Sequence, residues 1–232
     1  MGSSRHSERN ESKGRKLCPK VILEGTRLTL KTEIAFALNE HPRVVGPRSY
    51  RYTSPIISAE WCGFTNTPWG RGLVNFLPEE WDLAQDTYRA WLRLFELLRY
   101  YSWIADRFHL STKLYQKLVH GVDLDFGWLE ERLLPLGFRV VFCVRRPETF
   151  ALARVERVKG SGNPGQYVVL SRFVEEQELM RELVAGSALR SFEVDVSDSN
   201  VARAADAIAD WLEASGGLYL SGSSVAAVAG AD

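Results

Sequence analysis

The sequence predicts an α/β domain of three layers, in which a mostly parallel central sheet carries helices on both faces. An apolar stretch at residues 21–23 runs into a glycine-containing loop and then a helical pattern. A second apolar stretch at residues 100–104 runs into polar residues and another helical pattern. A helix, Gly137 and a strand follow one another further on. This alternation is typical of βαβ units, which build parallel sheets.

The first strand leads into a short helix. Residues 21–23 are continuously apolar, as expected of a strand that is buried on both faces. Residues 31–39 form the predicted helix, which ends before Pro42 because proline cannot continue it. Residues 44–45 form the expected second strand. The loop at residues 46–52 gathers arginines and aromatics and is expected to contact the substrate, through Arg48 and Arg51.

A long aromatic segment precedes the clearest helix. Residues 60–76 combine tryptophan, phenylalanine, proline and glycine, which predicts an irregular segment that is a lid, a pocket wall or a structural cluster. Residues 78–99 carry apolar side chains at helical spacing, so this helix belongs to the core and offers a subunit interface. Asp106 and Arg107 then follow the strand at residues 100–104, at the edge where parallel sheets bind their ligands.

The second half of the chain continues the same alternation. Either Asp123 or Asp125 caps a predicted helix at residues 123–134, and Gly137 separates it from a strand. The strands of this half are predicted at residues 138–144 and 191–196. Its other helices are predicted at residues 147–159, 170–184 and 200–214, with a flexible stretch at residues 160–165 that could close over phosphates.

Asp106 and Arg107 point to phosphoryl chemistry. An aspartate can hold magnesium or accept from a hydroxyl, and an arginine can place two hydrogen bonds on a phosphate. On these residues alone, an ion pair that caps a helix is an equally open alternative. His109 lies close enough to act as a base, but its position at a helix start predicts a surface role.

Residues 25–32 nearly form a phosphate-binding loop. In the motif G-x-x-x-x-G-K-[ST], backbone N–H groups surround the phosphates, lysine reaches the outer phosphates and the hydroxyl residue holds magnesium. Gly25, Lys31 and Thr32 fit this motif, whereas Leu30 stands at the second glycine. A side chain is unfavourable there if the backbone needs a positive φ.

The order of these two motifs resembles the thymidylate kinases among the P-loop nucleoside monophosphate kinases. Their E-G-x-x-x-x-G-K-[ST] is matched except at Leu30. The residues that match their D-R-x-x-x-S-T-x-A-Y-Q are Asp106, Arg107, Ser111, Thr112, Tyr115 and Gln116. The strand at residues 138–144, the Pro147-Glu148 pair and the helix with Arg154 and Arg157 are similar to their arginine-bearing lid region. The arginine-proline-glycine-glycine pattern of their second strand is missing, so dTMP is not the expected acceptor.

The resemblance implies a P-loop NTPase-like fold and a homodimeric phosphotransferase. Such a kinase moves a phosphoryl group from a magnesium nucleotide, ATP or another nucleoside triphosphate, to a nucleotide, a nucleoside relative or a specialised metabolite. The implied catalytic residues are Lys31, Asp106 and Arg107, and Thr32 and Asp106 would hold magnesium. The implied nucleotide-binding residues are Glu24, Gly25, Lys31, Thr32 and Arg154. The implied acceptor-binding residues are Arg48, Arg51, Arg107, Ser111, Tyr115 and Gln116.

Two alternatives stay open. Leu30 favours a non-catalytic or repurposed P-loop-like protein that binds a nucleotide or another small anionic ligand. Retention of Lys31, Thr32 and Asp106 opposes it, because a scaffold without activity has no chemical need for them. A third possibility keeps the fold but holds a different anion, with Arg27, Arg48 and Arg51 as its ligands.

Composition predicts one domain and leaves a small anionic ligand open. The chain has 232 residues, 45% of them hydrophobic, which suffices for one sizeable core. We expect a flexible arm at residues 1–17, the kinase-like domain at 18–216 and a flexible tail at 217–232. The 29 basic and 29 acidic residues cancel, so neither nucleic acid nor membrane is an expected partner. No apolar run approaches the ~18 residues of a spanning helix, and the first residues are polar, so we expect a cytoplasmic protein.

Overall fold

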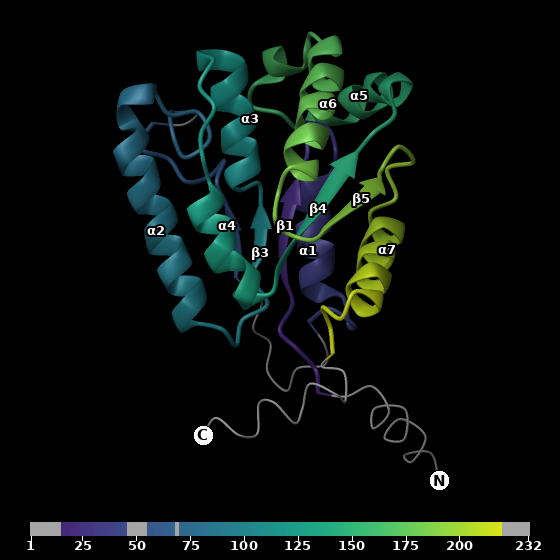
Figure 1. Ribbon diagram of the computed structural model, residues 1–232. Coiled ribbons are helices and arrows are strands. Elements are labelled where there is room, and N and C mark those ends of the chain that lie inside the picture. The colour runs from purple at the N-terminus through teal and green to yellow at the C-terminus, as the bar shows by residue number, and fades with distance from the viewer. Residues whose placement is uncertain (1–14, 46–54, 68–69, 220–232) are drawn as a thin grey trace.

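The sheet of the protein is wholly parallel. The computed structural model describes residues 15–45, 55–67 and 70–219, and Figure 1 shows their arrangement. The strand order is β2-β3-β1-β4-β5, and each neighbouring pair is parallel. The strands are β1 (Lys20–Glu24), β2 (Ile56–Ser58), β3 (Ile104–Asp106), β4 (Phe138–Val144) and β5 (Ser191–Asp195). Their carboxyl ends therefore meet at a single edge, and the segments that follow them share that edge.

Helices cover both faces of this sheet. The α-helices are α1 (Lys31–Glu40), α2 (Trp81–Leu97), α3 (His109–His120), α4 (Gly127–Leu133), α5 (Phe150–Lys159), α6 (Ser171–Ala185) and α7 (Val201–Ala214). In the described part of the chain four short 3-10 helices accompany them: η1 (Pro78–Glu80), η2 (Leu134–Leu136), η3 (Pro147–Thr149) and η4 (Pro164–Tyr167). None of the helices in the described ranges is long and apolar enough to cross a membrane.

Alternate side chains of the central strand face two separate cores. Ile22 lies in one core with buried residues of α2, α3, α4 and α6. Val21 and Leu23 lie in the other core, against α1 and α7. Since successive strand residues point to opposite faces, this division is the expected result of a sheet buried on both sides. The predicted three-layer α/β architecture is confirmed (Figure 1).

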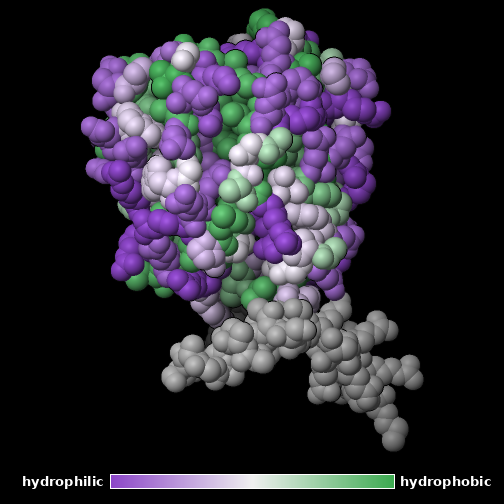
Figure 2. All heavy atoms as spheres, in the orientation of Figure 1, coloured by the Kyte–Doolittle hydropathy of each residue, from purple (hydrophilic) through white to green (hydrophobic). Residues whose placement is uncertain are grey.

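Helix α2 buries only part of its apolar surface. Its inner face carries Ala84, Tyr88, Leu92 and Phe95, all essentially without solvent contact. Leu83, Leu94 and Leu97 are about half exposed or more. The predicted core role of this helix therefore holds for one stripe of its residues. Figure 2 shows that polar side chains surround the hydrophobic ones over most of the face drawn.

The predicted second strand at residues 44–45 is wrong. This segment is a turn, in which the carbonyl of His41 accepts from the N–H groups of Val44 (3.1 Å) and Val45 (3.0 Å). Val44 is buried against α1 and α7 without joining the sheet. Residues 44–45 are apolar because they pack beside these helices. The second strand of the chain is β2.

Two other boundaries differ from the predictions. The helix expected over residues 123–134 begins only at Gly127, because Asp125 Oδ1 accepts from the Gly127 N–H at 2.8 Å and holds a turn before it. The strand expected over residues 100–104 pairs only from Ile104 and extends to Asp106. Asp106 is thus the last residue of β3 and is held as firmly as the sheet itself.

Both ends of the described chain meet beside the sheet. The Leu17 N–H donates to the Leu218 carbonyl at 2.8 Å, and Lys16 and Tyr219 form an isolated antiparallel bridge. These residues belong to the predicted flexible ends. The rest of those ends, residues 1–14 and 220–232, and the predicted substrate residues Arg48 and Arg51 lie outside the described residues.

Candidate active site

The loop after β1 keeps the backbone of a phosphate-binding loop in spite of its leucines. Leu28 (φ 68°) and Leu30 (φ 56°) are both left-handed, and residues of ordinary φ flank them. Such alternation turns successive N–H groups toward one side and forms an anion-binding concavity. No described residue accepts a hydrogen bond from the backbone N–H groups of residues 26–30. Leu30 therefore adopts the conformation for which glycine is usually selected, at a cost of about 1–2 kcal/mol.

Packing around the loop holds this strained backbone. Leu28 packs against a small cluster of Phe150, Tyr167 and Phe173. The Leu28 carbonyl accepts from Arg145 Nε at 2.9 Å, and Arg145 is almost fully buried. Leu30 packs against the core that α1 and α7 share. Tertiary contacts thus stabilise a conformation that leucine alone would disfavour.

Gly25 is required where the loop leaves the sheet. Its φ of +146° lies in a region that L side chains rarely adopt, and a Cβ atom there would lie 2.5 Å from the Cys143 carbonyl oxygen. Real Cβ atoms essentially never approach backbone oxygen so closely, so the loop can pass β4 only with glycine at this position.

Lys31 folds back over the loop. Its Nζ donates to the Thr26 carbonyl at 2.6 Å and to Thr29 Oγ1 at 3.2 Å. Within the described residues it forms no ion pair with a carboxylate. Burial, aided by the positive charge of Arg107 and opposed by Asp106, lowers the pKa of Lys31 to about 8. A buried ammonium without a direct carboxylate partner is well suited to an incoming anion.

Thr32 and Asp106 meet across the sheet edge. Thr32 Oγ1, in the first turn of α1, donates to Asp106 Oδ2 at 2.5 Å. A hydroxyl and a carboxylate are hard oxygen ligands of the kind that Mg²⁺ prefers. No cluster of three or more His, Cys, Asp or Glu side chains that could hold a metal occurs in the described ranges. This pair fits magnesium that keeps several waters and completes its shell with substrate phosphates.

Glu60 is a site residue that sequence reasoning missed. It follows β2 by two positions, and its carboxylate contacts Arg107 Nε at 2.9 Å and Arg27 Nη2 at 3.5 Å. The positive charge of Arg107 lowers the pKa of Glu60, and Arg27 acts in the same direction. The sequence does show an acidic residue shortly after an apolar strand, which could have identified Glu60. It was missed because the second strand was predicted at residues 44–45 and not at residues 56–58.

Arg107 has an unusual backbone conformation, and its N–H donates to the Leu23 carbonyl at 2.9 Å while its carbonyl accepts from the Ala59 N–H at 3.2 Å. Its φ is 62°, and only 7% of its surface is exposed. The guanidinium therefore belongs to the buried edge of the sheet, beside Asp106 and Lys31. Lys31, Thr32, Asp106 and Arg107 were predicted separately from two motifs, and the fold brings all four together with Glu60.

Glu24 and Ser111, two further predicted site residues, hold the amino end of α3. Glu24 is fully buried and accepts from the N–H groups of Phe108 (3.0 Å) and Ser111 (3.3 Å). Ser111 Oγ donates to Glu24 Oε2 at 2.5 Å. Both side chains are thus engaged at the amino end of α3, where a carboxylate is favourable. In the described contacts they hold the start of α3, which directly follows Arg107 and Phe108, and their predicted roles toward ligands stay predictions.

The last two residues of the second motif lie further along α3. Gln116 is buried, and its Nε2 donates to the Phe76 carbonyl at 2.9 Å and to the Val74 carbonyl at 3.4 Å. This bond fastens the aromatic segment of residues 60–76 to α3. Gln116 Oε1 is buried and has no partner in the described structure. The half-buried Tyr115 instead contacts His120, with ring centroids 6.1 Å apart.

The two arginines of α5 occupy different positions. Arg157 Nη1 lies 3.4 Å from Glu33 Oε1 in the first turn of α1, and its Nε lies 3.4 Å from the Tyr167 hydroxyl. Arg154, the predicted nucleotide ligand, has neither a hydrogen bond nor an ion pair within the described residues. Arg157 is therefore the arginine that links α5 to the helix of the phosphate loop.

The predicted surface role of His109 is wrong. The side chain is fully buried, and its Nε2 lies 2.8 Å from Glu130 Oε1. Phe108 and Phe126 pack around the ring, each with its centroid 5.6 Å away. The reason is that the first turn of α3 faces the core between the sheet and α4, so a position at the helix start is not a surface position.

Comparison with known proteins identifies the fold. No family model matches the chain, and no curated protein matches its sequence. The YorR protein of Bacillus subtilis, whose structure was determined in complex with phosphorylated GDP, is 18% identical with a TM-score of 0.55, over 84% of this chain and 95% of that chain. A likeness at this identity shows a shared fold, and it confirms the predicted three-layer P-loop-like architecture.

Two enzymes align at lower TM-scores. A gluconokinase from Sinorhizobium meliloti 1021 gives 0.45 at 16% identity, over 87% of this chain and 97% of that chain. A shikimate kinase from Acinetobacter baumannii, in complex with shikimate, gives 0.41 at 13% identity, over 85% and 94%. Neither alignment adds to the assignment of the fold.

Proposed function

We propose that the protein is a phosphotransferase that moves the terminal phosphoryl group of a magnesium nucleotide to a small acceptor. The observation that carries this proposal is the Thr32–Asp106 hydrogen bond of 2.5 Å beside the buried Lys31, under a loop of left-handed residues. The loop backbone, a buried ammonium that forms no ion pair within the described residues, and two hard oxygen ligands thus lie together at one edge of a parallel sheet. Phosphoryl transfer is catalysed by this kind of positioning and charge neutralisation.

Each residue has a role that its surroundings support. Lys31 would pair with the transferring phosphoryl, and the backbone of residues 25–30 would bind the other phosphates. Thr32 and Asp106 would hold magnesium, which when bound neutralises phosphate charge. Arg157 would approach the phosphates from α5, since it already contacts the first turn of α1. Arg154 would assist from the same helix.

The acceptor site would lie beside Glu60 and Arg107. Arg107 and Arg27 keep the Glu60 carboxylate ionised, so it can accept a hydrogen bond from an acceptor hydroxyl and orient that group. An acceptor that presents a hydroxyl, such as a nucleoside relative or another small metabolite, fits this carboxylate. The thymidylate-kinase-like resemblance is consistent with such an acceptor and does not require dTMP.

Nucleotide binding provides the direct test. ATP with Mg²⁺ should raise the melting temperature of the protein, because a ligand selective for the native state stabilises it. Lys31→Ala should abolish the shift, whereas Lys117→Ala, at the exposed end of α3, should keep it. The measurement is thermal unfolding with ATP, ADP and nucleoside monophosphates, with and without magnesium. Absence of a shift with every nucleotide would overturn the proposal.

The pH dependence of nucleotide binding should reveal Lys31. Its ammonium is protonated below a pKa of about 8 and loses its charge above it. If Lys31 stays protonated when Mg·ATP is bound, the affinity of the protein for Mg·ATP should fall by up to about tenfold for each pH unit above this pKa. Titration calorimetry between neutral and alkaline pH measures this slope. Lys31→Met should bind more weakly and show a flat profile; an equal slope in that variant would assign the titration to another group.

Leu30→Gly separates the kinase from a repurposed binding protein. We expect the free energy of unfolding to change by less than about 1 kcal/mol, since relief of left-handed strain offsets the lost packing of Leu30 and the added freedom of glycine. Nucleotide binding should be kept or strengthened, because glycine retains the positive φ. Urea unfolding and ATP titration measure both quantities. Weaker nucleotide binding would show that Leu30 shapes a pocket for a different ligand.

A further inference from the structure

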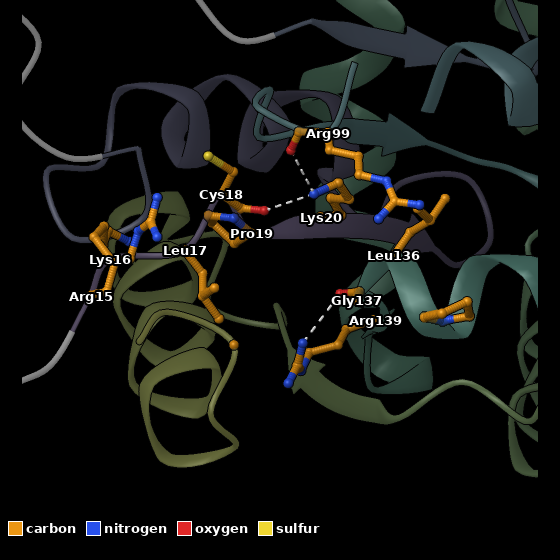
Figure 3. A pocket seen from close by; sticks show the side chains of 12 residues that line it. Arg15, Lys16, Leu17, Cys18, Pro19, Lys20, Arg99, Leu136, Gly137 and Arg139 are labelled. Atoms are coloured by element: carbon orange, nitrogen blue, oxygen red, sulfur yellow. Dashed lines mark hydrogen bonds between the residues drawn. The ribbon is translucent and has the colours of Figure 1, made fainter. Parts of the chain in front are cut away.

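A second cluster of positive charge lies at the opposite edge of the sheet. A cavity of about 400 Å³ opens beside the amino ends of β1 and β4 (Figure 3). Five of its lining residues are cationic and none of the described ones is acidic. The cationic residues are Arg15, Lys16, Lys20, Arg99 and Arg139.

Four of these cations, all except Arg15, donate hydrogen bonds to neutral backbone carbonyls. Lys20 Nζ, which is buried, donates to the carbonyls of Cys18 and Arg99, both at 3.1 Å (Figure 3). Lys16 Nζ donates to the Val44 carbonyl at 3.0 Å, and Arg99 Nε to the Glu96 carbonyl at 3.3 Å. None of the five forms an ion pair within the described residues. The negative charge of Glu213 acts to raise the pKa of Lys16, but Glu213 does not line the cavity.

One N–H donor of Arg139 has no hydrogen-bond partner in the described structure. Its Nη1 and Nη2 donate to the carbonyls of Gly137 (3.2 Å) and Ser215 (3.1 Å). Its Nε is buried and has no partner in the described structure. A buried donor on a cation is costly unless a partner satisfies it. Burial also lowers the pKa values of Lys16, Lys20 and Arg139, because removal from water disfavours their charged forms.

We propose that this cavity is a second anion-binding site, which takes a small organic phosphate. Five cations around one cavity suit a dianion better than a single carboxylate. The volume lies within the range of small-molecule sites and exceeds what a bare phosphate ion needs. Leu17, Pro19 and Leu136 supply apolar walls for the uncharged part of such a ligand. The site is independent of the phosphate loop, which lies at the other end of β1.

The test uses full-length Lys31→Ala protein, so that binding at the phosphate loop does not contribute. Titration calorimetry at low salt with phenyl phosphate should show one site. Arg139→Gln should weaken it about 10- to 100-fold, the expected effect of losing a hydrogen bond to a charged group. Arg99→Gln, at an exposed residue, should weaken it in the same direction without disturbing the fold. Lys159→Gln on α5 should leave it unchanged.

The same titration with inorganic phosphate distinguishes two sources of the ligand. Tighter binding of phenyl phosphate shows that an organic body is recognised, and equal binding shows a site for the phosphate ion itself. No binding to Lys31→Ala protein would overturn the second site. Binding that neither Arg139→Gln nor Arg99→Gln weakens would overturn it too. In both cases the proposal for the phosphate loop would stand, because that loop is tested separately by nucleotides.

Discussion

Asp106→Asn should reduce magnesium-dependent phosphoryl transfer about 100- to 1,000-fold, the usual loss when one group that stabilises transition-state charge is removed. The substitution removes a negative charge from the predicted magnesium site and keeps nearly the same shape. The asparagine oxygen can still accept from Thr32 Oγ1, so the 2.5 Å contact between α1 and β3 has a substitute. ADP release with saturating ATP and Mg²⁺ measures the effect.

The melting temperature without nucleotide provides the control for folding. It should change little in Asp106→Asn, whereas the additional stabilisation that magnesium gives to ATP binding should disappear. Asp123→Asn is the matched control, because Asp123 is exposed and its one ion pair within the described residues is with Lys113 at 3.3 Å. Full magnesium-dependent transfer by Asp106→Asn would place the metal elsewhere and exclude the proposed role of Asp106.

Gly25→Ala should destabilise the fold by about 3 kcal/mol or more. Two costs combine, since alanine disfavours the φ of +146° and its Cβ would lie 2.5 Å from the Cys143 carbonyl oxygen. That oxygen belongs to β4, the neighbour of β1 in the centre of the sheet, so neither strand can move without losing ladder hydrogen bonds. Urea unfolding measures the change in free energy.

Gly121→Ala measures the cost of a positive φ without a steric contact, at a milder φ than that of Gly25. Gly121 also has a positive φ (+67°), but an added Cβ would meet no heavy atom within 4 Å. Its replacement should cost only about 1 kcal/mol, the price of a left-handed L residue. Equal losses in the two variants would mean that the contact with Cys143 relaxes and that backbone conformation alone makes Gly25 necessary.

Sequence periodicity predicted most of the regular structure because burial on both faces leaves a direct pattern. The strand at residues 138–144 matches β4 at both ends, and α1 and α7 differ from their predicted ranges by one residue each. The misplaced second strand arose where an apolar pair is buried outside the sheet. Val44 packs beside helices, and periodicity cannot distinguish this burial from that of a strand.

The candidate site likewise contains residues that the sequence could identify and residues that only the structure reveals. Gly25, Lys31, Thr32, Asp106 and Arg107 could be selected from spacing, because these residue types carry phosphoryl chemistry. Glu60 could not be selected, since its relevance depends on β2 lying next to β3 and on Arg107 reaching it. The buried pairing of His109 with Glu130 likewise joins residues from two helices. Contacts between distant segments leave no local pattern in the sequence.

By itself the sequence determined the layer architecture, the edge of the sheet at which the candidate site lies and the residue types present there. Only the tertiary structure decided whether the loop at Leu30 could keep an anion-binding backbone. Local preference opposes a left-handed leucine, but Leu28 packs into the cluster of α5, η4 and α6, and Arg145 holds its carbonyl. Packing energy from distant segments outweighs the local cost, and that balance cannot be derived from the motif alone.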